Sequence, residues 1–103
     1  MSKIVMALDQ GTTSSRTILF SEKGEIVADA NAPLACHYPQ SGWVEQDPQE
    51  IWTSQSQTIQ EALKKAALTM KDIAAVGITN QRETTIAWNR NTGEAIAPAI
   101  NWQ

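Results

Sequence analysis

This 103-residue sequence has a single cysteine and lacks long apolar runs. Cys36 is the only cysteine, so no intramolecular disulfide can form, which fits a protein of a reducing cytoplasm. No window approaches the roughly 18 consecutive apolar residues of a membrane-spanning helix. The apolar run at residues 4–8 is too short for a secretory signal. We therefore expect a cytoplasmic protein that does not insert into a membrane.

An excess of basic residues is also lacking. The net charge is −3, so the composition gives no reason to expect binding to nucleic acid or to a membrane surface. His37, the single histidine, follows Cys36 directly, but adjacent residues of an extended segment point to opposite faces, which argues against a catalytic pair. Two such residues are also too few for a structural zinc site. With 42% hydrophobic residues, the length suits one globular domain with a small core.

The most informative stretch is residues 9–16, Asp-Gln-Gly-Thr-Thr-Ser-Ser-Arg, which follows a short apolar strand. Asp9 stands at the tip of that strand, and Gly11 allows a tight turn and a close approach to a ligand. Arg16 adds a fixed positive charge. Four hydroxyl side chains surround the turn: Thr12, Thr13, Ser14 and Ser15.

These parts suit a metal-bound polyphosphate. Exposed N–H groups of a turn bind phosphate oxygens, and a carboxylate such as Asp9 can reach the metal ion directly or through water. The alternative is an ordinary hairpin turn between two apolar strands. The stretch is not a Walker A loop, because no Gly-Lys-Ser/Thr follows.

The first third of the chain predicts three strands, over residues 3–9, 14–21 and 25–34, joined as an antiparallel meander. Prolines and a glycine interrupt the following stretch, which we expect to be a loop through Gln46. Trp43 and Val44 are apolar residues in that loop and are expected to pin it to the body of the protein or to contact a partner.

A helix is predicted to begin after Asp47, because this residue is a natural N-cap, Pro48 suits the first helical position and Glu50 follows three residues after the cap. Apolar residues recur at helical spacing from there. We expect Trp52 and Ile59 to face the core and the helix to end near residue 68. The opposite, polar face is predicted to contain Gln55, Gln57, Gln60, Glu61, Lys64 and Lys65.

Residues 74–79, Ala-Ala-Val-Gly-Ile-Thr, are small, apolar and nearly continuous. This pattern predicts a strand buried on both faces and parallel to the first strand after the helical crossover. Another strand is predicted over residues 84–89, and an irregular or edge strand over 95–102, which contains Pro98. A meander, a helix and one crossover strand make about half of an α/β domain, so we expect a piece of a longer protein with apolar faces that need covering.

A second polar constellation, Asn-Gln-Arg-Glu-Thr-Thr at residues 80–85, follows the buried strand. Ligands of open α/β sheets bind at the carboxyl ends of the strands. If the first and the crossover strand are parallel neighbours, Asp9, Arg82 and Glu83 reach the same edge. Such a set can hold a small polyhydroxylated molecule, because the guanidinium donates to hydroxyl oxygens and the carboxylates accept from hydroxyl protons. The alternative is a solvated surface hairpin.

Taken together, four stretches resemble the N-terminal part of the glycerol kinases, which belong to the FGGY carbohydrate kinases of the actin-like ATPase superfamily. Residues 9–16 carry the widely shared Asp-x-Gly-Thr turn, and residues 77–85, Gly-Ile-Thr-Asn-Gln-Arg-Glu-Thr-Thr, carry the more specific pattern. Residues 42–48, Gly-Trp-Val-Glu-Gln-Asp-Pro, and 101–103, Asn-Trp-Gln, complete it. The resemblance runs over essentially the whole chain, which would be about the first fifth of such an enzyme.

The resemblance implies a ribonuclease-H-like α/β fold, with residues 1–103 forming an incomplete N-terminal part of the first kinase domain. It implies ATP-dependent phosphorylation of glycerol to glycerol 3-phosphate with Mg²⁺, in a protein that is a homo-oligomer, either a dimer or a tetramer. Asp9 matches the acid near the metal ion. Glycerol contacts match Arg82, Glu83 and Trp102. The phosphate contacts match Gly11, Thr12, Thr13 and Arg16, with Ser14 beside them.

The catalytic base of the family, an aspartate, is expected downstream, so the isolated chain is expected to be inactive. Two alternatives remain open. The protein could be another FGGY kinase that acts on a sugar or a different polyol, although relatives such as xylulokinases have a Gln-Met-His-Gly-like segment in place of Arg82 and Glu83. It could also be a non-catalytic actin-like nucleotide-binding module. A free-standing binding module fits the end of the chain less well.

Overall fold

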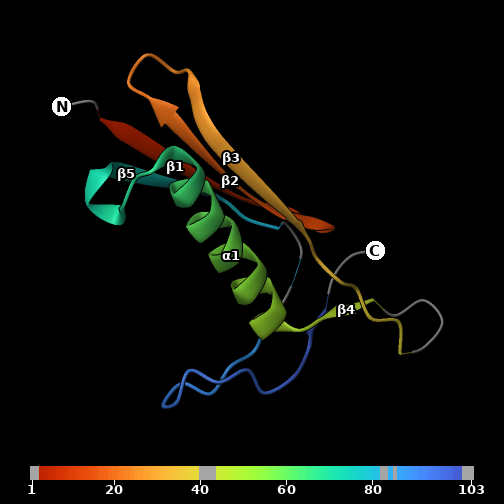
Figure 1. The fold of residues 1–103 in the computed structure, drawn as a ribbon. Helices are drawn as coiled ribbons and strands as arrows, with labels where there is room; N and C mark the ends of the chain where they lie inside the picture. The colour runs from red at the N-terminus through yellow and green to blue at the C-terminus, as the bar shows by residue number, and fades with distance from the viewer. Residues whose placement is uncertain (1–2, 40–43, 82–83, 85, 101–103) are drawn as a thin grey trace.

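A four-stranded mixed sheet and one long helix organise the molecule (Figure 1). The computed structural model describes residues 3–39, 44–81, 84 and 86–100. The strand order is β3-β2-β1-β5, with β1, β2 and β3 antiparallel and β5 parallel to β1. This confirms the predicted meander, helical crossover and α/β class. The elements of this layer are β1 (Ile4–Gln10), β2 (Ser14–Ser21), β3 (Ile26–Pro33), α1 (Pro48–Ala66), the 3₁₀ helix η1 (Met70–Asp72) and β5 (Ile73–Thr79).

Helix α1 begins and ends with recognisable caps. The Asp47 carboxylate accepts a hydrogen bond from the Gln49 N–H at 2.9 Å, as its N-cap position predicts. The helix ends at Ala66, slightly before the predicted end, because Ala67 adopts a left-handed conformation with φ 55°. The Leu68 N–H then bonds the Leu63 carbonyl at 2.9 Å, which closes the last turn. Among the described residues, no helix combines the length and apolar character needed to cross a bilayer.

The core lies between α1 and the meander. Alternate residues of β1 and β2 point to the helix, as the period of two requires. Its buried members are Ile4, Met6, Leu19, Ala30, Ala62 and Leu63. Helix α1 packs mainly on β2 and β3, so β5, which lies beyond β1 on the same sheet face, receives little cover from it.

A polar network also lies under α1. The Gln55 amide donates to the Arg16 carbonyl at 3.0 Å and to the Thr17 hydroxyl at 3.1 Å, and the Thr17 and Thr58 hydroxyls are 2.8 Å apart. Gln55 is therefore buried, contrary to the prediction that it lies on the solvent face. Trp52 is also misplaced by the sequence pattern, since its side chain is 60% exposed while Ile59 packs against the core.

Three predictions of strands or loops need correction. Strand β5 is exposed along most of its length rather than buried on both faces. The described residues within 84–89 form no strand beyond an isolated bridge from Trp88 to Ala95. The loop through Gln46 contains the two-residue strand β4 (Glu45–Gln46), which pairs with β6 (Ala99–Ile100), so the irregular strand expected near the end of the chain is confirmed as a short one. Val44 is buried, as expected, and Trp43 lies outside the described residues.

Candidate functional site

The link between β1 and β2 is a hairpin whose tip is Thr12 and Thr13, here called the 11–14 turn. The Gly11 N–H donates to the Ser14 carbonyl at 2.9 Å and closes the tip. A Cβ at residue 11 would lie 3.0 Å from the same carbonyl oxygen, a separation that real Cβ atoms rarely tolerate. The tight turn predicted at Gly11 is confirmed, and there the backbone lies close to the backbone of Ser14.

The carbonyl groups of the tip are held from the inner side. The Leu34 N–H donates to the Thr13 carbonyl at 2.9 Å, and the Gln46 side-chain amide donates to the Thr12 carbonyl at 2.7 Å. Within the part of the chain that the structure describes, no acceptor bonds the N–H groups of Thr12 or Thr13. Adjacent unpaired N–H groups of a turn are what an anion such as phosphate requires.

Asp9 and Arg16 lie opposite each other on β1 and β2, and Asp9 also pairs with Thr79 on β5. These three residues form a row on the sheet face that α1 does not cover, because Thr17 and its alternating neighbours point to the helix. Arg16 already has a partner, since its guanidinium contacts the Asp29 carboxylate at 2.8 Å. The predicted cation beside the turn is thus present but paired.

The exposed carboxylate of Asp9 fits an Mg²⁺ site. Mg²⁺ in kinases is commonly bound by one or two carboxylates together with waters and substrate phosphates, so a single acid beside a phosphate-binding turn suffices. The described residues contain no group of three or more His, Cys, Asp or Glu side chains able to hold a metal ion without such help. The arrangement therefore suits a metal ion brought with a nucleotide.

The four hydroxyls around the turn do not act alike. Ser15 is fully buried and donates to the Gln10 side-chain oxygen at 3.1 Å, so it supports the hairpin from within. Thr13 is exposed, while Thr12 and Ser14 are partly buried. Ligand contacts are open to these last three rather than to the whole run.

The second constellation begins where β5 ends. The parallel pairing of Asp9 with Thr79 brings the carboxyl ends of β1 and β5 to one edge, as the sequence predicts. Beyond it, the Thr84 hydroxyl donates to the Gln81 side-chain oxygen at 2.8 Å, and the Gln81 amide nitrogen is buried without a described partner. The predicted polyol-contacting residues Arg82, Glu83 and Trp102 lie outside the described residues.

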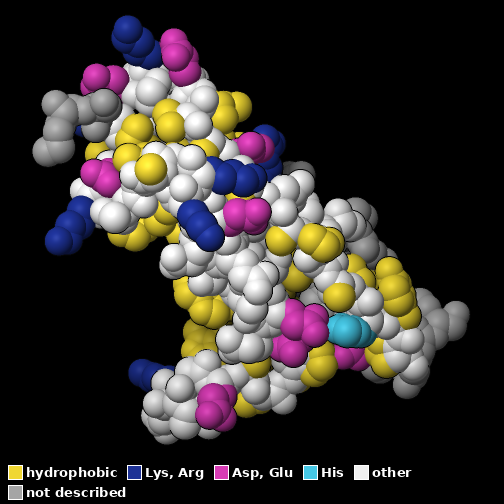
Figure 2. All heavy atoms as spheres, in the orientation of Figure 1, with side chains coloured by type: hydrophobic (Ala, Val, Ile, Leu, Met, Phe, Trp, Pro, Cys, Tyr) yellow, Lys and Arg dark blue, Asp and Glu magenta, His cyan; other side chains and the backbone are white. Residues whose placement is uncertain are grey.

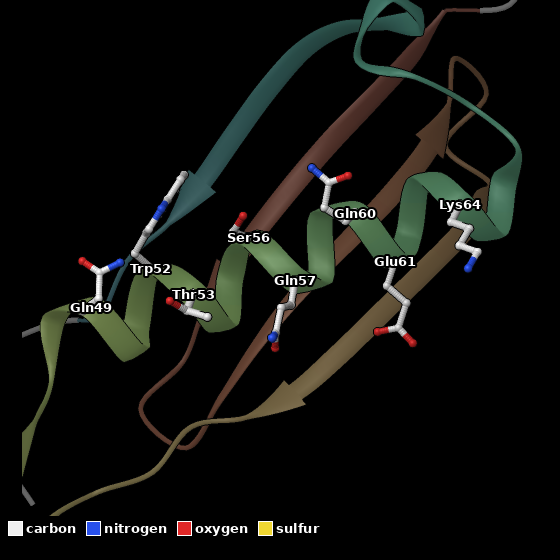
Figure 3. A pocket seen from close by; sticks show the side chains of 8 residues that line it. All are labelled: Gln49, Trp52, Thr53, Ser56, Gln57, Gln60, Glu61 and Lys64. Carbon is white, nitrogen blue, oxygen red and sulfur yellow. The ribbon is translucent and has the colours of Figure 1, made fainter.

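Among the described residues, two other polar features do not combine an acid with a turn in this way. A shallow hollow on the outer side of α1 is lined by side chains of that helix alone, including Trp52 and Lys64 (Figure 3). The ring of His37 contacts the Glu50 carboxylate at 3.3 Å, where Figure 2 places the histidine against acidic side chains. The Cys36 sulfur instead lies 3.3 Å from the Gln46 amide. The contacts described here for Cys36 and His37 are thus to different residues.

Gln46 is the residue of this region that the sequence pattern did not identify. It reaches Thr12 across 34 positions of the chain and is fully buried, although the sequence places it in a polar loop. The only local indication in the sequence was its position directly before the N-cap of α1, where the loop must come back to the rest of the protein.

Comparisons with known proteins agree on one family. The model of the N-terminal domain of the FGGY family of carbohydrate kinases matches residues 4–103. A glycerol kinase of Shewanella frigidimarina is 55% identical over the whole chain, and one of Acinetobacter baylyi is 59% identical over 96% of it. The chain covers 21% and 20% of these two proteins. It therefore spans about a fifth of the length of the relatives that it matches.

Solved structures give the same fold. The structure of Plasmodium falciparum glycerol kinase with ADP superposes with a TM-score of 0.87 at 34% identity, over 98% of this chain and 20% of that one. A xylulose kinase from Rhodospirillum rubrum superposes with a TM-score of 0.85 at 27% identity, over 95% of this chain and 20% of that one. The sheet and helix seen here are thus those of FGGY sugar kinases.

Proposed function

This chain belongs to the FGGY family of carbohydrate kinases, and we propose that the protein carrying it transfers the terminal phosphoryl group of ATP to glycerol. The observation that carries the proposal is the parallel pairing of Asp9 with Thr79. It brings the 11–14 turn and the residues that follow β5 to one edge of the sheet. A phosphate donor and a small polyol could then meet there. The glycerol kinases among the relatives support glycerol over other polyols.

In this reaction the 11–14 turn binds phosphate oxygens. The N–H groups of Thr12 and Thr13 point to the nucleotide, and the Ser14 hydroxyl and the Arg16 guanidinium assist. Asp9 would hold Mg²⁺, which would supply positive charge that neutralises the phosphate oxygens. Phosphoryl transfer depends mainly on positioning and on electrostatic stabilisation of the phosphoryl oxygens, so fixed N–H donors are the contribution that this segment can make.

Glycerol is held by Arg82 and Glu83 through its hydroxyl groups and by Trp102 through its carbon edge, since an aromatic wall suits a CH surface. The attacking hydroxyl oxygen forms a bond to the terminal phosphorus of ATP, and its proton passes to an aspartate downstream of residue 103. The bond between that phosphorus and the bridging oxygen breaks, and ADP leaves with the electron pair. We place the reaction in the cytoplasm, in a homo-oligomer of which residues 1–103 form part of the first domain. Because the base lies elsewhere, the isolated chain should have no kinase activity.

A second candidate is phosphorylation of a different polyol or sugar by the same site, which the likeness to a xylulose kinase structure favours. The two candidates differ in what Arg82 and Glu83 must recognise. A panel of glycerol, xylulose, gluconate and other polyols decides between them.

The test is Arg82→Ala in the native gene product that carries this chain. Loss of a charge-assisted hydrogen bond to substrate should lower kcat/KM for glycerol on the order of 100-fold, with a smaller change in the KM for ATP. Arg90→Ala is the matched control, because Arg90 is an exposed arginine of the following turn. Equal activity of the Arg82 variant and the parent would remove the polyol site from the proposal, and a parent that binds ATP without phosphorylating any polyol would favour a non-catalytic nucleotide-binding protein.

A further inference from the structure

Gln46 is a buried polar residue that the proposed reaction leaves unexplained. Its side chain is fully buried, its amide nitrogen bonds the Thr12 carbonyl at 2.7 Å and the Cys36 sulfur at 3.3 Å, and its amide oxygen has no partner among the described residues. An apolar side chain of similar size would avoid the cost of burying that unpaired oxygen. The buried amide therefore points to a task for its donor.

The orientation of the amide is determined by its neighbours. A flipped side chain would place its oxygen against the Thr12 carbonyl oxygen, and two acceptors repel each other, so only the nitrogen can face the turn. Strand β4 holds the backbone of Gln46 in place from two sides. Glu45 exchanges backbone hydrogen bonds of 2.7 and 2.8 Å with His37, and Gln46 pairs with Ala99 of β6.

Because the peptide is planar, fixing the direction of the Thr12 carbonyl also fixes the direction of the Thr13 N–H. The Thr12 carbonyl and the Thr13 N–H belong to one trans peptide, so they point in opposite directions. A carbonyl fixed toward Gln46 leaves the Thr13 N–H aimed away from the body of the protein. The Leu34 N–H does the same for the next peptide by holding the Thr13 carbonyl. The tip is thus held by the Leu34 N–H and the Gln46 amide, and the Cys36 thiol is a weaker donor 3.9 Å from the Thr12 carbonyl.

We propose that Gln46 is a positioning residue for the 11–14 turn, which it holds through the Thr12 carbonyl so that the Thr13 N–H is preorganised for a nucleotide phosphate. This inference rests on the phosphate-binding role proposed above for the turn. Gln46 does not touch the nucleotide or glycerol. Because Gln46 orders the peptide before ATP binds, it raises kcat/KM for ATP. It does not change the affinity for glycerol.

The test replaces Gln46 by methionine in the native gene product, which keeps the length of the side chain and removes the donor. We expect kcat/KM for ATP to fall about tenfold and the KM for glycerol to change less than about twofold. Thr58→Val is the control, because the Thr58 hydroxyl is also fully buried and donates to a main-chain carbonyl, that of Gln55 at 2.7 Å, which lies within α1 and not in the turn. The control variant should have a kcat/KM for ATP within about twofold of the parent, even if its melting temperature is lower.

Each other outcome counts against a specific claim. An unchanged kcat/KM for ATP in the Gln46 variant, in a parent that phosphorylates glycerol, overturns the positioning role and leaves the proposed function standing. Equal losses in the Gln46 and Thr58 variants assign the effect to general stability and also overturn the positioning role. If the methionine variant does not fold, Gln46→Asn gives the same comparison, because it keeps an amide but withdraws it from Thr12. A parent that neither binds nor uses ATP removes the proposed function and this inference together.

Discussion

The part of the sheet face that α1 covers and the open part on β5 differ in burial, although both contain apolar residues. Met6 and Val76 are register partners on β1 and β5 and lie on the same sheet face, yet Met6 is 1% exposed and Val76 is 47% exposed. The difference follows from the position of α1, which lies over β2 and β3 and leaves β5 open (Figure 1). An apolar strand thus indicates that cover is needed without indicating which segment supplies it. We expect further parts of a longer protein to cover β5.

The largest predicted effect compares a core residue with an open one. Leu19→Ala in the 103-residue chain should lower the free energy of unfolding by about 2–5 kcal/mol, because Leu19 is 0% exposed and its loss leaves a cavity under α1. Ile78→Ala should change it by less than about 0.5 kcal/mol, since Ile78 is 73% exposed. Urea unfolding followed by circular dichroism measures both.

The same pair of substitutions in the native gene product sharpens the comparison. If β5 is covered there, Ile78→Ala becomes costly while the effect of Leu19→Ala stays about the same. Similar costs for both variants in the 103-residue chain would contradict the difference between the covered and the open part.

A smaller effect compares two glycines. Gly11→Ala should destabilise the 103-residue chain by about 1–3 kcal/mol, because its Cβ meets the Ser14 carbonyl and the hairpin tip must open. Gly77→Ala should be close to neutral or stabilise by up to about 1 kcal/mol, since nothing lies within 4 Å of its Cβ and alanine reduces the freedom of the unfolded chain. Thermal unfolding of the two variants tests this. A Gly11 variant as stable as the Gly77 variant would show that the turn can relax.

The covered part was also the easier part to predict from sequence. The meander and the start of α1 rest on local signals, namely alternating apolar residues, Gly11 in a turn and the Asp47-Pro48 cap, and the structure has all of them. The parallel neighbour relation of β1 and β5 followed from the handedness and shortness of crossover connections. The order of elements and the edge at which the candidate site lies could therefore be predicted.

The failures arose where tertiary contacts decide. Helical spacing placed Gln55 in solvent and Trp52 in the core, but Gln55 has acceptors on β2 and the Trp52 side chain is 60% exposed. Residues 84–89 alternate like a strand, yet in the described part of that stretch only Trp88 pairs with another residue, Ala95, in an isolated bridge. Gln46 could not be connected to Thr12 without coordinates, because no periodicity relates a loop residue to a distant hairpin tip.

The smallest predicted effect concerns the face of β2 and β3 that α1 does not cover. Arg16 and Asp29 form an ion pair of 2.8 Å there, with side chains 40% and 47% exposed, so water and salt screen the attraction. Asp29→Asn should lower the free energy of unfolding by about 0.2–1 kcal/mol, and the difference should shrink at about 1 M salt, where the screening length is about 3 Å. Urea unfolding at low and high salt measures it. A larger loss that salt does not reduce would mean that this carboxylate holds β2 and β3 together by more than charge, and the distinction between the buried network under α1 and the surface pair on the other face would then fail.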